Sequence, residues 1–163
     1  MKKKKYLSTG IFLINKKFKK NEYYHYLQTP HVVVTVPVLK NKKFIVVFQK
    51  REPINKKNYE FPSGLVDKNE GFQRNAKREL YEETGYKCLS ALKKLLVLYP
   101  DPGRLNHSVI CYLAKNLIKI NKPEKGIKIF YFTKKEIIGL IKKRKFNSAT
   151  HIAAFYHYLS KKN

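Results

Sequence analysis

Apolar residues along the chain fall into short runs separated by polar, lysine-rich segments. Runs rich in β-branched and aromatic residues predict five strands, at residues 31–39, 44–49, 92–99, 108–115 and 127–132. The polar turn at residues 40–42 predicts that the first two strands form a hairpin, followed by polar loops at 54–59 and 116–126. Pro37 lacks a backbone N–H, so it predicts a sheet edge or a bulge late in the first strand.

Three other segments have helical periodicity. Between residues 71 and 83, Phe72, Ala76 and Leu80 form an apolar stripe at i, i+4 and i+8. Gly85 predicts a left-handed end to this helix. The sequence from Thr133 to Glu136 is a capping-box pattern, which predicts a helix to about residue 143. A last helix is predicted at residues 148–160, with an apolar side made of Ile152, Phe155, Tyr156 and Leu159. Together with the strands, this order predicts a mixed α/β domain.

The first 29 residues are basic and aromatic and do not resemble an independent core. They predict short strands at 12–14 and 23–27 with a turn at 16–20. Pro30 marks the boundary to the main domain at residues 30–163. We therefore expect an N-terminal arm that packs on the body or on a second subunit.

The net charge of +25 comes from 36 basic and only 11 acidic residues. Lysine supplies 31 of the 36 and is spread along the whole chain, whereas nucleic-acid readers use more arginine and clustered patches. Nucleic acid therefore stays an alternative partner rather than the expected one. No apolar run reaches the roughly 20 residues that a membrane helix needs. Cys88 and Cys111 are too few for a disulfide scaffold, and residues 1–14 lack a cleavage site, so we expect a cytoplasmic protein.

Acidic residues, although scarce, are concentrated in one stretch of the chain. Five of the 11 lie between residues 67 and 83, namely Asp67, Glu70, Glu79, Glu82 and Glu83. The last three are spaced i, i+3 and i+4, which places them on one side of the predicted helix. Neighbouring carboxylates repel one another, and clustered oxygen ligands suit hard cations such as Mg²⁺. The spacing therefore predicts a metal site.

The same stretch resembles the Nudix box. Gly64, Glu70, Arg78-Glu79, Glu82-Glu83 and Gly85 match its fixed positions, and Tyr86 stands where Ile, Leu or Val is usual. Pro102, 16 residues past the box, is similar to the proline that marks the ADP-ribose and ADP-sugar pyrophosphatases. The resemblance implies an α/β/α sandwich with a mixed sheet, an N-terminal strand arm and two C-terminal helices.

The resemblance also implies a metal-dependent chemistry and assigns residues to it. Mg²⁺, with Mn²⁺ as an alternative, would be bound by Glu79 and Glu83, with Glu82 and the Ser63 carbonyl as further ligands. Gly64 would let the loop turn tightly against the helix. Arg78 would orient the glutamates, and Glu70 would brace the loop. The expected homodimer, in which each arm reaches the other subunit, also follows from the resemblance.

The resemblance implies the hydrolysis of an ADP-sugar to AMP and a sugar phosphate. It makes Arg51 and Pro102 candidate substrate-binding residues, and Arg104 is a further candidate because it follows the Pro102 loop. The catalytic base is left open between Glu124, on the loop before the last predicted strand, and Glu82. Two alternatives also remain. One is a Nudix hydrolase of a dinucleotide or an RNA 5′ end, and the other is a non-catalytic nucleotide- or RNA-binding module.

Overall fold

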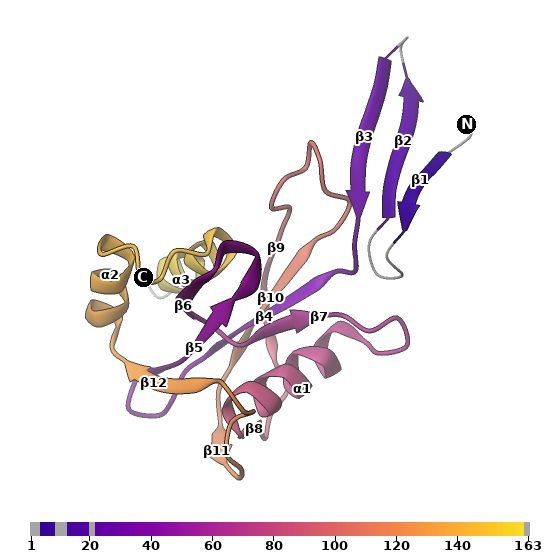
Figure 1. The fold of residues 1–163 in the computed structure, drawn as a ribbon. Coiled ribbons are helices and arrows are strands. Elements are labelled where there is room, and N and C mark those ends of the chain that lie inside the picture. Colours follow the sequence, from indigo (N-terminus) through magenta and orange to yellow (C-terminus); the bar gives the residue numbers. More distant parts are fainter. Residues whose placement is uncertain (1–3, 9–12, 20–21, 162–163) are drawn as a thin grey trace.

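A four-stranded sheet in the order β7-β4-β10-β9 lies at the centre of the fold (Figure 1). The structure, a computed structural model, describes residues 4–8, 13–19 and 22–161. Strands β4 and β10 are parallel, and β7 and β9 pair with them in antiparallel fashion. The strands of this sheet are β4 (Val32–Pro37), β7 (Ser63–Leu65), β9 (Lys93–Leu98) and β10 (Val109–Ala114).

A second, antiparallel sheet has the order β12-β5-β6, and a small two-stranded sheet pairs β11 with β8. A 3₁₀ turn, η1, connects β5 to β6. The bounds are β5 (Phe44–Arg51), η1 (Glu52–Ile54), β6 (Lys56–Glu60), β8 (Tyr86–Cys88), β11 (Leu117–Lys119) and β12 (Lys128–Phe132).

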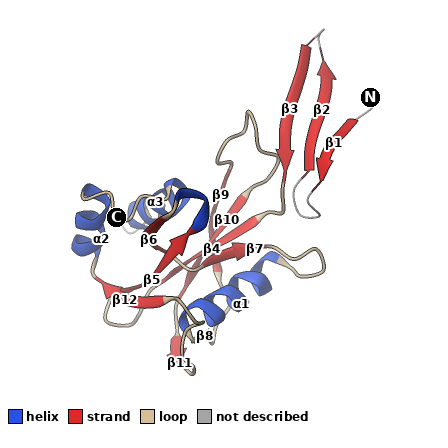
Figure 2. Cartoon of the chain, viewed as in Figure 1, coloured by secondary structure: helices blue, strands red, loops and turns tan. Residues whose placement is uncertain are grey.

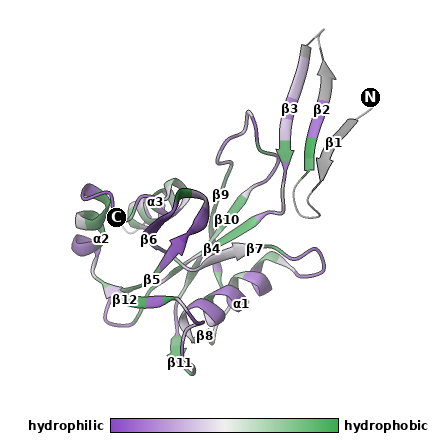
Figure 3. Ribbon diagram, in the orientation of Figure 1, coloured by the Kyte–Doolittle hydropathy of each residue, from purple (hydrophilic) through white to green (hydrophobic). Residues whose placement is uncertain are grey.

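Three helices complete the body, with α1 on one side of the strands and α2 and α3 on the other (Figure 2). They are α1 (Phe72–Thr84), α2 (Lys134–Lys142) and α3 (Ala149–Ser160). Alternate residues of β4 serve the two sides, because Val33 packs with Ala76 and Leu80 of α1, whereas Val34 packs with Phe155 of α3. The predicted α/β/α sandwich is therefore confirmed. Hydrophobic residues concentrate in β4 and β10 (Figure 3).

The N-terminal arm is an antiparallel sheet that projects from the body (Figure 1). Its strands are β1 (Lys4–Ser8), β2 (Leu13–Lys19) and β3 (Glu22–Gln28). The turn predicted at residues 16–20 is wrong, because β2 continues to Lys19, which pairs with Glu22. Strand β1 was not predicted, and Phe12 and Lys20 lie outside the described residues. The division of the chain at residue 29 stays a proposal.

Several strand predictions fail at the level of pairing. The hairpin expected between the first two strands is wrong, because β4 and β5 belong to different sheets and share only the Val38–Phe44 bridge. Two predicted loops also contain strands, β6 and β11. Pro37 is the last residue of β4. Thr35 donates its N–H to the Pro62 carbonyl, next to the start of β7. Pro37, two residues later, has its backbone nitrogen on the same side of β4. Strand β7 does not extend that far, so no N–H is needed there.

The three predicted helices and their ends are confirmed, but Tyr156, which was predicted on the apolar side of the last helix, is 45% exposed. Gly85 ends α1 in the left-handed conformation, with φ of 70°. Thr133 and Glu136 form the predicted capping box of α2. Phe72 is not part of the core, because it is 40% exposed and makes an edge contact with the His31 ring. Among the described residues, no helix combines the length and apolar character needed to cross a bilayer.

Candidate active site

Glu83 is the buried centre of the carboxylate cluster. Its Oε2 accepts the N–H of Ser63 at 2.9 Å, and its Oε1 accepts a hydrogen bond from Gln49 Nε2 at 3.1 Å. Helix α1 thus brings Glu83 against both β7 and β5. Burial raises the pKa of Glu83 to about 7, although these two hydrogen bonds act in the opposite direction. A buried carboxylate of this kind favours either a proton or a cation.

Glu79, one turn earlier on α1, lies directly against Gly64. A Cβ atom at position 64 would collide with the Glu79 carboxylate. Gly64 lies in strand β7 and is not among the residues with positive φ. The glycine is therefore required for a close approach to the helix and not for the tight turn that we expected. Burial also raises the pKa of Glu79.

Arg78 connects the remaining acids of the cluster. Its Nη1 lies 2.9 Å from carboxylate oxygens of both Glu79 and Glu82. Its Nε and Nη2 lie 3.2 and 3.1 Å from oxygens of Glu70 and Asp67. Burial would lower the pKa of Arg78, but these partners outweigh it and raise the pKa. These contacts fit an orienting function for Arg78 and a bracing function for Glu70, and both assignments stay predictions.

The donor set suits a hard divalent cation, because it consists of carboxylate oxygens and the Ser63 carbonyl. In the part of the chain that the structure describes, however, no three acidic, His or Cys side chains converge as ready-made ligands. The reason is that Arg78 pairs with Glu79 and Glu82, while Glu83 is bonded to Ser63 and Gln49. The residues therefore fit a cation chemically, and Arg78 holds only one carboxylate oxygen of Glu79 and one of Glu82.

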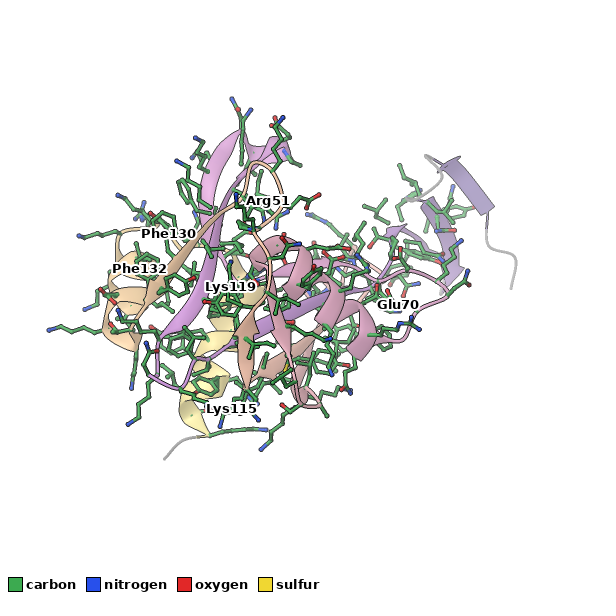
Figure 4. All side chains as sticks on the ribbon, turned by 90° about the horizontal axis from the view of Figure 1, so that it is seen from below. Arg51, Glu70, Lys115, Lys119, Phe130 and Phe132 are labelled. Carbon is green, nitrogen blue, oxygen red and sulfur yellow. The ribbon has the colours of Figure 1, made fainter. Side chains whose placement is uncertain are left out.

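Arg51 ends strand β5 and reaches the same place from the opposite wall. Its Nε donates to Glu60 Oε2 at 2.9 Å, and its Nη2 lies 3.5 Å from Ser63 Oγ. Burial acts to lower the pKa of Arg51, but the hydrogen bond and charge of Glu60, with a smaller contribution from the charge of Glu83, outweigh burial and raise the pKa. In Figure 4, Arg51 and Glu70 mark two ends of the site, with α1 between them.

The other candidate residues lie at different distances from this cluster. The N–H of Glu124 donates to the Glu82 carbonyl at 2.9 Å, so its loop adjoins the end of α1, and its side chain is exposed. Pro102 and Arg104 are exposed on the loop after β9. That loop pairs with β3, because Leu27 donates its N–H to the Arg104 carbonyl at 2.7 Å. Within one chain, the structure does not bring Pro102 or Arg104 to the carboxylates.

Sequence reasoning missed two polar residues of the site, Gln49 and Glu60. Gln49 could have been found, because strand alternation places it on the same face as Arg51. Glu60 could not be placed beside Arg51, because the segment before it, 54–59, was predicted as a loop and its pairing with β5 was not predicted. Tyr86 has an unexpected contact, since its hydroxyl lies 3.0 Å from that of Tyr131. This contact links the segment after α1 to strand β12, and burial raises the pKa of Tyr86 to about 12.

Comparison with known proteins gives consistent matches. A family model described as NUDIX domain matches residues 29–155. A methanol dehydrogenase activator of Bacillus methanolicus is 32% identical over 133 residues, which are 78% of this chain and 71% of that protein. An ADP-ribose pyrophosphatase of Bacillus subtilis is 29% identical over 120 residues, which are 71% of this chain and 64% of that protein.

A second ADP-ribose pyrophosphatase, from Mycobacterium tuberculosis, is 34% identical over 93 residues, which are 56% of this chain and 44% of that protein. The match therefore spans less than two thirds of either pyrophosphatase. A crystal structure described as an ADP compounds hydrolase superposes with a TM-score of 0.82 at 18% identity, over 98% of this chain and 91% of that one. This superposition shows the same fold.

Proposed function

Because the chain belongs to the Nudix family and is therefore a Nudix hydrolase, we propose that it cleaves the diphosphate bond of ADP-ribose or a related ADP-sugar. The products would be AMP and a sugar phosphate. Two relatives named ADP-ribose pyrophosphatase support this substrate class. The observation that carries the proposal is the position of Arg51, whose guanidinium lies beside Ser63 and within the field of Glu83. A diphosphate bound by Arg51 would lie next to the carboxylates.

The residues divide into two groups. Glu79, Glu82, Glu83 and the Ser63 carbonyl would hold Mg²⁺ or Mn²⁺, which would neutralise phosphoryl oxygens and lower the pKa of a bound water. Arg51 would bind the diphosphate by charge-assisted hydrogen bonds and orient it. Either Glu124 or Glu82 would accept the proton of the attacking water. The two residues adjoin at the end of α1, where the Glu124 N–H donates to the Glu82 carbonyl.

A substrate panel with Mg²⁺ tests the proposal. We expect fastest release of AMP from ADP-ribose or an ADP-sugar, compared with dinucleotides and with RNA carrying a 5′ triphosphate or cap. The RNA arm is included because of the net charge of +25. Glu83→Gln should reduce turnover by about 10³-fold or more while the circular dichroism spectrum is unchanged. A clear preference for RNA would reject the ADP-sugar assignment and retain the hydrolase.

We also propose a homodimer in which the arm contacts the neighbouring subunit. The arm is a projecting sheet (Figure 1), and it exposes apolar and aromatic side chains, among them Ile14, Tyr23 and Tyr24. Light scattering should give twice the chain mass of 19.3 kDa, and a monomeric mass would contradict the dimer.

Arg104→Ala would test the substrate contact expected of the loop after β9. We infer a cytoplasmic location because Cys88 and Cys111 are both free, and cell fractionation would check it.

A further inference from the structure

Four polar side chains share one face of the β5–β6 hairpin. Register pairs Arg51 with Lys56, Gln49 with Asn58 and Val47 with Glu60. Directly paired residues of an antiparallel ladder point to the same side, so Gln49, Arg51, Asn58 and Glu60 all lie on the face that Gln49 presents to Glu83. This face is the wall of the site opposite α1.

Glu60 is the anchor of this face. It is only 4% exposed, and both of its carboxylate oxygens are used. Asn58 Nδ2 donates to Oε1 at 3.0 Å, while Arg51 Nε and Nη2 both donate to Oε2. Burial would raise the pKa of Glu60, but the hydrogen bond from Arg51 and the other contacts outweigh burial and lower it. Glu60 is therefore a buried carboxylate, and such a group is stable only when paired.

No other cation in the described chain balances this charge. His151 of α3 is close enough to Glu60 to interact with its charge and is buried, and its Nδ1 accepts the N–H of Phe61 at 3.0 Å. Burial lowers the pKa of His151 to about 4, so its ring is neutral near pH 7. Among the described residues, Arg51 is the only ion-pair partner of Glu60. Glu60 and Arg51 are thus fixed by each other.

The pairing determines which edge of Arg51 is available. Nε and Nη2 are occupied by Glu60, and Nη1 has no hydrogen-bond partner among the described residues. The side chain remains 39% exposed, although its guanidinium is held in place. Nη2 lies 3.5 Å from Ser63 Oγ, and the Ser63 N–H is bonded to Glu83. The guanidinium is consequently held next to Ser63, one of the proposed metal ligands, with its Nη1 unoccupied by any described residue.

We propose that Glu60 is a positioning residue, which fixes Arg51 so that the free Nη1 edge binds the diphosphate of the substrate. This proposal rests on the proposed function, because it takes Arg51 as the diphosphate ligand. Without Glu60, the guanidinium would keep its charge and lose its anchor, and it would be free to turn towards Glu83. A misplacement of about 1 Å at such a group can reduce the rate by roughly 10²-fold.

The first test needs no turnover. In ¹⁵N-labelled protein, the Arg51 Nε–H group should give a resolved NMR signal, because it is bonded to Glu60. Glu60→Gln should remove that signal through exchange with solvent, while Glu60→Asp, which keeps the charge, should retain part of it. The matched control is Glu52→Gln, because Glu52 is an exposed acid paired with Lys50 at 3.0 Å on the neighbouring turn. An unchanged Arg51 signal in Glu60→Gln would overturn the proposal.

The second test is a double-mutant cycle with Arg51→Ala. Glu60→Gln should lower kcat/KM by roughly 10²-fold, mostly as a raised KM, and by less than about twofold when Arg51 is already alanine. The same loss in both backgrounds would show that Glu60 acts on the fold and not through Arg51. The cycle uses whichever diphosphate substrate the wild type cleaves fastest. If the wild type prefers a substrate other than an ADP-sugar, the proposed function is rejected, but the cycle still tests the role of Glu60. If no substrate is cleaved, the NMR experiment decides.

Discussion

Gly64 and Glu79 show how one missing side chain shapes the site. We predict that Gly64→Ala lowers kcat/KM by at least about tenfold, because a Cβ atom would displace the Glu79 carboxylate. Stability should change by only about 1 kcal/mol, since the displaced group is the end of a flexible side chain. Gly139→Ala in α2 is the control, because a Cβ there meets nothing within 4 Å. Unchanged activity in Gly64→Ala would remove Glu79 from the site. Steady-state kinetics and thermal melting make the comparison.

Glu83 predicts a specific dependence of stability on pH. Its pKa is about 7 in the folded protein against 4.5 as the ordinary value, so the folded state binds the proton more tightly. The contribution of Glu83 to the free energy of unfolding is therefore fully present below about pH 4.5 and is lost as pH rises through 7. A shift of this size corresponds to about 3 kcal/mol.

Denaturation of metal-free wild type and Glu83→Gln across pH 4 to 8 would isolate this contribution. Glu60 affects stability in the opposite direction, because its pKa is lowered in the folded protein and its contribution is lost as pH falls. The difference between the two proteins removes such shared contributions. Wild type should lose stability relative to the variant as pH rises, and added Mg²⁺ should restore it, because the cation binds the ionised carboxylate. A difference that stays constant across the range would refute the buried, raised-pKa state.

At the scale of the elements, the end of α1 depends on Gly85. Its φ is 70°, and a Cβ there would collide with the backbone carbonyl of Asn121. The Gly85 carbonyl also accepts the N–H groups of Ile120 and Asn121, which connects α1 to the segment after β11. We predict that Gly85→Ala costs about 3 kcal/mol of unfolding free energy, measured by urea denaturation.

Gly126 provides the matched comparison for that variant. Its φ of 94° also lies in the region that alanine rarely adopts, but a Cβ there meets nothing within 4 Å. Gly126→Ala should therefore show the backbone strain alone, of about 1 kcal/mol. The excess cost at Gly85 would measure the contact with Asn121. Equal costs at the two positions would mean that this contact contributes nothing.

The elements also show what the sequence could predict. Helix α1, its Gly85 end and the capping box at Thr133 rest on residues within one or two turns, so local spacing is sufficient for them. The acidic cluster on α1 was predictable for the same reason. Strand β6, by contrast, has the sequence Lys-Lys-Asn-Tyr-Glu, which carries little strand signal by itself. It is a strand because it pairs with β5.

Strand pairing is where prediction from sequence ended, and it is also where Glu60 was missed. The β4–β5 hairpin failed because register and sheet membership depend on distant partners, such as β10 for β4 and β12 for β5. The Arg51–Glu60 pair exists only once β5 and β6 are paired. The carboxylates on one helix were therefore predictable from their spacing, and Arg51, Ser63 and Gly64 from the resemblance, whereas the contacts made by strand pairing were not.

At the scale of the whole molecule, the net charge of +25 should act on stability and on catalysis with opposite signs. Like charges repel across the folded surface, so raising the KCl concentration from 20 to 200 mM should raise the melting temperature by screening. The same screening weakens the attraction of an anionic diphosphate, so kcat/KM should fall by several-fold. Stopped-flow or steady-state assays at low substrate, beside thermal melts in the same buffers, would measure both. If kcat/KM were unchanged while the melting temperature rose, the lysines would affect the fold alone and would not concentrate substrate at the site.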